Sequence, residues 1–267
     1  MTRMVTSLSA LILSIVLLVS GNAFLMTLLG IRLSIEEVSP NVIGWVLVCY
    51  SIGFVLGTLY VHKIIGRVGH IRAFAVFAAM AAVVSLMYPM AVSMIFWAVL
   101  RVLSGFSIAG VLVVIESWFS SRATNANRGA LFAVYQIVFY LSAAGGQLIV
   151  NIGDPASFLP FSLAAILLTV ALIPLSLTRM EAPAIEQVHR MSIFKLGRES
   201  FSGVAGALIS GVMIGGFYAL GPVYATLVGL DVARTSTFMA SAIIAAMLLA
   251  WPLGRVCDRF DRRRVMF

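Results

Sequence analysis

Long apolar runs, separated by short polar segments, dominate this chain of 267 residues. A helix that crosses a bilayer needs about 20 consecutive, mostly apolar residues. Eight stretches meet that requirement: Ser7–Leu29, Val42–Val61, Ala73–Ala91, Ser93–Phe119, Gly129–Ile152, Ser157–Leu177, Phe201–Leu227 and Thr237–Leu253. The pattern therefore predicts an all-α membrane protein with at least eight spanning helices.

Composition supports a lipid environment. Hydrophobic residues make up 61% of the chain and charged residues 10%, and the mean hydropathy is +1.07. A soluble domain is about half apolar and about a quarter charged, so the predicted partner of most of the surface is the lipid bilayer. The first apolar run continues from Leu8 to Leu29. It is too long for a removable signal peptide and predicts a retained helix.

Basic residues determine the predicted orientation. With a cytoplasmic N-terminus, the inner loops hold all but three of the 18 Lys and Arg residues; Arg32 and Arg234 lie outside and Arg101 lies within the fourth helix. Such an excess of inner positive charge is typical of membrane proteins. The net charge of +8 therefore reflects topology. No basic face is long enough to follow a phosphate backbone, so no nucleic-acid partner is predicted.

The longest polar stretch lies between the sixth and seventh predicted helices. It divides the chain into a six-helix bundle over residues 1–178, a cytoplasmic linker over 179–200, and two helices with a loop over 201–267. Similar segments follow the second and eighth helices, at 66–72 and 254–264, offset by 192 residues when Arg67 is superposed on Arg259. Six helices return the chain to the same side, so the repeat predicts two parallel halves. We expect a partial sequence, with further C-terminal helices in the full-length protein.

The second of these loops resembles the major facilitator superfamily. The family signature G-x-x-x-D-R-x-G-R-R is matched, in order, by Gly254, Asp258, Arg259, Arg262 and Arg263, with Asp261 in place of the second glycine. In the first loop Arg67 and Gly69 match, and Gly66 stands where the signature has aspartate. In the fourth helix Arg101 and Gly105 match the family pattern R-x-x-x-G.

Together with Glu116-Ser117-Trp118 and the segment Gly221–Ala225, these motifs resemble the bacterial YcaD-like branch. The resemblance implies a major-facilitator-type helical bundle, with eight of twelve expected transmembrane helices present. It also implies secondary active transport of a small solute by alternating access, coupled to protons, across a bacterial cytoplasmic (inner) membrane. The Gly-Pro motif of drug:proton antiporters is absent from the fifth helix, where Gly145-Gly146 occurs without proline.

Two ionisable residues inside predicted spans are the main transport and coupling candidates, because such residues are costly in a bilayer. Arg101 either lines a cavity, where it could bind an anionic group or modulate a proton site, or extends to the interface. Glu116 lies about 22 Å further along the same helix. It either pairs with Arg122 or Arg128, or titrates as the coupling carboxylate.

Several uncharged residues are candidates for a cavity. Polar side chains within the spans either bind substrate or join helices by hydrogen bonds; they are Asn22, Gln136, Gln147, Tyr218 and Tyr224. In the seventh helix Gly221 and Pro222 predict a hinge, because proline removes a backbone hydrogen bond. The resemblance implies that Asp258 docks on the N-terminus of the fifth helix, so that the second loop latches the inner gate. The alternative is a loop that only anchors at the headgroups.

Other chemistry is not indicated. The two cysteines and three histidines show no metal-ligand spacing. The sequence has no phosphate-binding Walker loop and no nucleophile–base pair. We therefore predict no metal, no cofactor and no enzyme activity. A membrane sensor or regulator built on a transporter fold, or a non-functional fragment, is the alternative to a transporter.

Overall fold

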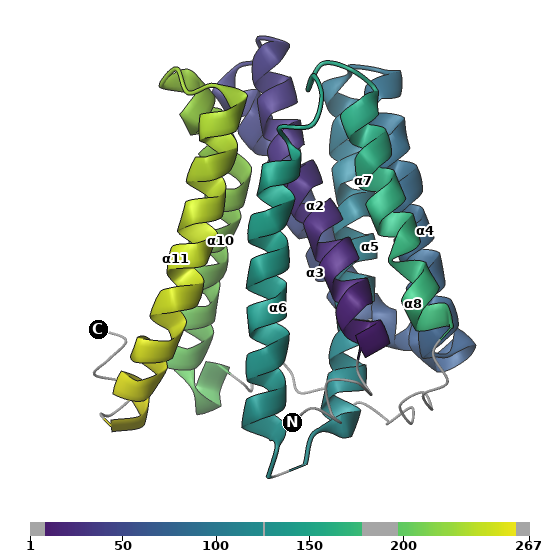
Figure 1. Cartoon of the computed structure of the whole chain (residues 1–267), viewed down its shortest axis with the longest axis vertical. Helices are drawn as coiled ribbons and strands as arrows, with labels where there is room; N and C mark the ends of the chain where they lie inside the picture. Colours follow the sequence, from purple (N-terminus) through teal and green to yellow (C-terminus); the bar gives the residue numbers. More distant parts are fainter. Residues whose placement is uncertain (1–8, 125, 178–196, 260–267) are drawn as a thin grey trace.

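The computed structural model describes residues 9–124, 126–177 and 197–259, with side chains described as far as residue 250 and at 252 (Figure 1). All regular elements in these ranges are helical. They are α2 (Ser9–Ile35), α3 (Pro40–Val68), α4 (His70–Met87), the 3-10 turn η1 (Tyr88–Met90), α5 (Met94–Arg122), α6 (Arg128–Ile149), α7 (Leu159–Val170), α8 (Leu172–Ser176), α10 (Phe201–Leu227) and α11 (Val232–Arg259).

The predicted number of spans is confirmed. Within the described residues, eight helical segments are long and apolar enough to cross a membrane, with α4 and η1 forming one span and α7 and α8 another. Several helices extend past their apolar runs. The 29 residues of α3 reach about 44 Å, longer than the roughly 30 Å hydrocarbon core, so its polar end extends into the headgroup region.

This extension corrects the predicted loops. The segment after the second span was expected to be a loop from Gly66, but α3 continues through Arg67 to Val68. Only Gly69, with a φ of 83°, separates α3 from α4. Likewise the start of the second motif, from Gly254 to Arg259, is part of α11. Helical structure continues because backbone groups near the membrane are satisfied within a helix.

Glycines bring α3 and α5 into backbone contact. A Cβ added at Gly53 would lie 1.9 Å from the Val102 carbonyl oxygen, and one at Gly105 would lie 2.0 Å from the Tyr50 carbonyl oxygen. Small residues let membrane helices approach this closely. In α10, by contrast, Gly211 and Gly215 have no atom within 4 Å of such a Cβ among the described residues.

A Gly105→Ala variant is expected to be less stable by about 1–3 kcal/mol, because α3 and α5 must separate to admit the methyl group. The measurement is the unfolding midpoint of the purified chain in detergent. Gly211→Ala is the matched control, since a methyl group there meets open space. Equal midpoints for the two variants would contradict the proposed role of Gly105 in packing.

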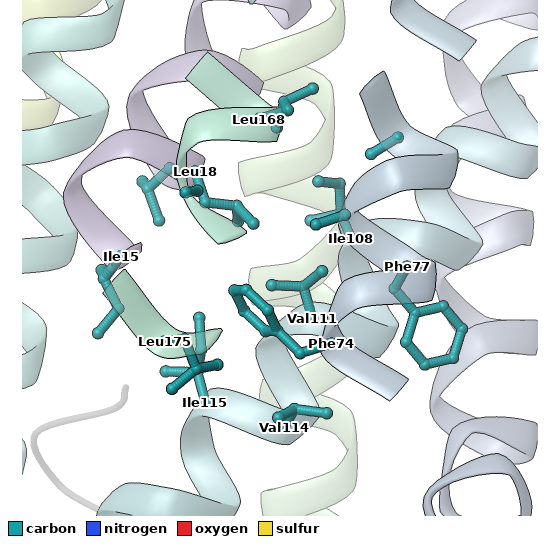
Figure 2. Close-up of a cluster of buried hydrophobic side chains, with 14 of the residues drawn as sticks. Ile15, Leu18, Phe74, Phe77, Ile108, Val111, Val114, Ile115, Leu168 and Leu175 are labelled. Carbon is teal, nitrogen blue, oxygen red and sulfur yellow. The ribbon is translucent and has the colours of Figure 1, made fainter. Parts of the chain in front are cut away.

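The first six spans share an apolar core. Figure 2 shows Ile15 and Leu18 of α2 facing Phe74 of α4 and Ile115 of α5, together with Leu168 of α7. A second cluster lies nearer the opposite ends of these helices, around Phe24, Leu28 and Phe161 among others. From α11, Ala240 and Ile243 join the first cluster. The helix pair α10–α11 thus packs on the side of the bundle rather than within it (Figure 1).

Candidate functional site

Arg101 lies in the second turn of α5 and is only 1% exposed. One guanidinium nitrogen lies 3.0 Å from the Met26 sulfur and donates to the Leu47 carbonyl oxygen at 3.4 Å. The guanidinium carbon lies 4.6 Å from the centre of the Tyr50 ring, in a cation–π arrangement. The side chain therefore does not extend to the interface; it is held between α2 and α3.

The spacing of the R-x-x-x-G pattern has a geometric explanation here. Gly105 follows Arg101 by one turn, and its missing side chain admits the backbone of Tyr50. The close approach sets the Tyr50 ring against Arg101. Asn22 of α2 interacts with the Tyr50 hydroxyl, so this predicted cavity residue joins the Arg101 cluster. Asn22, Met26 and Tyr50 are partly exposed.

Tyr88 also belongs to this cluster. Its side chain is fully buried and interacts with Arg101, although its hydroxyl makes no hydrogen bond of good geometry. The Arg101 Nε is likewise buried without a hydrogen-bond partner. Among the described residues the ion pairs are Arg32 with Glu36 at 2.5 Å and Arg234 with Asp231 at 3.9 Å. Arg101 therefore has no carboxylate partner in the described part of the chain.

Glu116 lies near the C-terminal end of α5 and is exposed. It accepts a hydrogen bond from the Tyr135 hydroxyl at 3.3 Å. Residues of α3, α5 and α6 surround it in an open pocket of about 320 Å³, lined by His62, Val113, Ser117, Ser120 and Phe132.

The predicted ion pair of Glu116 with Arg122 or Arg128 is not formed within the described residues. Instead the Arg128 guanidinium lies 6.0 Å from the Phe132 ring centre. Glu116 thus faces open space with one phenol as its partner.

The remaining polar candidates do not converge on Arg101. Gln147 is buried between α6 and α2, where it accepts from the Thr27 hydroxyl and donates to the Ala23 carbonyl oxygen at 3.4 Å. Gln136 and Tyr224 are exposed, and Tyr218 packs beside Tyr140. In this geometry Gln147 joins two helices.

The two hinge candidates lie at a contact between helices. Pro222 is buried, and a Cβ added at Gly30 of α2 would meet its ring at 3.1 Å. A Cβ at Gly221 would lie 2.9 Å from the Met239 sulfur of α11. The helix α10 is continuous across both residues, from Phe201 to Leu227.

Little of the gate-loop motif is described. Arg67 is exposed at the end of α3 and Gly69 follows it. The side chains of Asp258 and Arg259 lie outside the described residues, as do Arg262 and Arg263 entirely. The latch on the N-terminus of α6 stays a prediction.

The bundle and the pair α10–α11 are joined near the C-terminal ends of α2, α6 and α10. The Thr226 hydroxyl donates to the Ser34 hydroxyl at 3.1 Å, and Asn151 and Ser236 exchange hydrogen bonds of 3.0 and 3.2 Å. Toward the C-terminal end of α11, this helix diverges from α6 (Figure 1). The N-terminal half of α10 is exposed, with Val212 at 75%.

The described residues include no group of three or more His, Cys, Asp or Glu side chains that could hold a metal ion. The geometry thus has a buried cation with aromatic neighbours, an exposed carboxylate in a pocket near the C-terminal end of α5, and a contact between two helical units near the C-terminal end of α10.

Solved transporter structures share this fold. The structure of the nucleoside transporter NupG matches with a TM-score of 0.72 at 16% identity, over 95% of this chain and 68% of that one. A bacterial homologue of the human lysosomal transporter Spinster, in an inward-facing and unoccupied conformation, matches with a TM-score of 0.73 at 13% identity, over 96% and 64%.

Sequence comparison gives the family. The MFS-type transporter YcaD of Escherichia coli (strain K12 / DH10B) is 33% identical over 262 residues, covering 94% of this chain and 66% of the relative. The YcaD protein of Salmonella newport (strain SL254) is 32% identical over 257 residues, and the chain again spans 66% of its length. The family profile described as Major Facilitator Superfamily matches residues 5–267. The chain is therefore a member of the Major Facilitator Superfamily, a family of multi-pass membrane transporters.

Proposed function

We propose that this chain is part of a secondary active transporter, which moves a small solute across the membrane by alternating access and couples that movement to protons. Residues 1–178 form the first bundle, 179–200 the cytoplasmic linker, and 201–267 the beginning of the second bundle. The protein lies in a bacterial inner membrane with its N-terminus in the cytoplasm, as the distribution of basic residues favours.

One observation carries the proposal: the two helical units meet at their outer ends and diverge toward their inner ends (Figure 1). In this proposal the arrangement is the inward-facing state, in which the two units touch on the outer side and are separated on the cytoplasmic side. Two units that rock about a central site are the basis of alternating access. Arg101 and its partly exposed neighbours Asn22, Met26 and Tyr50 would bind the solute between the two units.

Solute counterflow into proteoliposomes tests this function, using the longest chain the gene encodes. Nucleosides and D-xylose are the first solutes to try, because similar folds occur in a nucleoside transporter and a D-xylose–proton symporter. A transporter exchanges labelled for unlabelled solute without any added energy source. A protein that binds solute but never exchanges it would instead be a sensor or regulator, and a fragment would do neither.

We propose Glu116 as the coupling carboxylate, because it is exposed in a pocket and has a neutral hydrogen-bond partner. A Glu116→Gln variant keeps the shape of the side chain but cannot bind and release a proton. It is expected to lose uptake driven by a pH gradient while keeping counterflow, which needs no net proton movement.

The two assays on the same proteoliposomes separate coupling from solute binding. Tyr135→Phe is the control, since it removes the hydroxyl and leaves the carboxyl group able to titrate. Gradient-driven uptake that persists undiminished in Glu116→Gln would rule out this role for Glu116.

A further inference from the structure

The Arg101 cluster holds a positive charge without a counter-charge. The guanidinium stays protonated in proteins, and it is 1% exposed in a membrane-spanning helix. Its described neighbours are a thioether, a carbonyl oxygen and an aromatic ring, none of which carries a full negative charge. Buried charges in proteins are normally paired, because removing an isolated ion from water is costly.

Two unused hydrogen-bond donors lie in the same cluster. They are the Nε–H of Arg101 and the hydroxyl of Tyr88, both buried and without a partner of good geometry in the described structure. The two side chains are close enough to interact. Buried donors in proteins almost always have a hydrogen-bond partner, and that partner can be a water molecule or an ion.

Aromatic rings form one side of this cluster around Tyr88. Trp97 packs edge-on against Tyr88, with ring centres 5.2 Å apart, and Phe161 lies 6.3 Å away on centre. The Trp97 indole is itself satisfied by the Ala91 carbonyl oxygen at 2.9 Å. Two unpartnered buried donors beside aromatic rings and a fixed positive charge have the chemistry of an anion site.

We propose that Arg101 and Tyr88 together bind one small monovalent anion, a halide or the carboxylate of a small organic acid. The Arg101 Nε–H and the Tyr88 hydroxyl donate to it, and the guanidinium supplies the opposite charge. A water molecule would satisfy the donors but leave the charge uncompensated. The ligand must be small because both side chains are almost fully buried. The proposal goes beyond transport, since the charge must be balanced whether or not a solute moves.

The test measures the unfolding midpoint of the purified chain in sodium gluconate, whose anion is too bulky for the site. Chloride, bromide, formate and acetate are titrated in at constant ionic strength. Binding to the folded state is expected to raise the midpoint saturably, by about 3–5 °C at roughly ten times Kd. A response to the halides alone identifies an inorganic ion, and a response to the carboxylates identifies an organic acid; either supports the site.

Substitutions test whether the anion-dependent rise of the unfolding midpoint arises at Arg101 and Tyr88. Arg101→Gln is expected to abolish the saturable rise, and Tyr88→Phe to raise Kd about tenfold through the loss of one hydrogen bond to a charged group. Arg234→Gln is the matched control, because that arginine is 74% exposed and should leave the rise unchanged. Tyr88→Phe is nearly isosteric, so the test survives if Arg101→Gln does not fold.

Equal midpoints in all five salts would overturn the anion site, as would a saturable rise that persists undiminished in Tyr88→Phe. Solute exchange in a protein without any anion response would reject this site and leave the transport proposal standing. An anion response in a protein that exchanges no solute would support the anion site and reject the transport proposal.

Discussion

Proteoliposomes that carry Arg101→Gln are expected to lose solute counterflow, by on the order of a hundredfold. The reason is that Arg101 is the one charged side chain fully buried among the described residues, and its cluster joins α2, α3 and α5. Removing it takes away this buried charge and leaves Tyr50 and Tyr88 without their shared neighbour.

The decisive comparison is between flux and stability in the same preparation. The unfolding midpoint of Arg101→Gln should stay within a few degrees of the parent chain, because the lost contacts are offset by the lost cost of burying a charge. Arg234→Gln, at an exposed arginine, should keep full counterflow. Undiminished counterflow in a folded Arg101→Gln protein would remove Arg101 from the transport site.

A disulfide between Ser34→Cys and Thr226→Cys is expected to stop counterflow completely, with recovery after reduction. The two hydroxyl oxygens lie 3.1 Å apart across the outer contact, so two sulfurs at these positions can bond with small adjustments. The bond would hold α2 and α10 together and prevent the outer side from opening. The background chain needs Cys49 and Cys257 replaced first.

Gel mobility after a protease cut in the linker reports the cross-link, and counterflow before and after reductant reports its effect. The single variant Ser34→Cys, oxidised in the same way, should transport normally. The pair Asn151→Cys, just after α6, and Ser236→Cys, in α11, tests the same contact and should behave like the first pair. A fully cross-linked protein that still exchanges solute would show that the outer contact does not open during transport.

The helices could be predicted from the sequence because lipid demands long apolar runs. The range Phe201–Leu227 is the same in prediction and structure. The ends of α3 and α11 could not be predicted, because apolarity marks only the part inside hydrocarbon and the helix continues through polar residues.

The site was harder to predict because it depends on how helices tilt and meet. Gln136 and Gln147 lie about 20° apart around α6, yet one is exposed and the other is buried against α2. The reason is that α2 crosses α6 obliquely and separates from it toward the N-terminal end of α6 (Figure 1). Tyr50 and Met26 were missed for the same reason, since they reach Arg101 from helices 51 and 75 residues away.

The outer contact between the two units is electrically neutral. Its described polar partners are hydroxyls and one amide, and Pro222 packs on Gly30 beside them. Screening by dissolved ions acts only on charges. The equilibrium between a closed and an open outer contact should therefore not depend on ionic strength. A few hydrogen bonds worth about 1 kcal/mol each oppose separation only weakly, so little free energy is needed to part the two units at this contact.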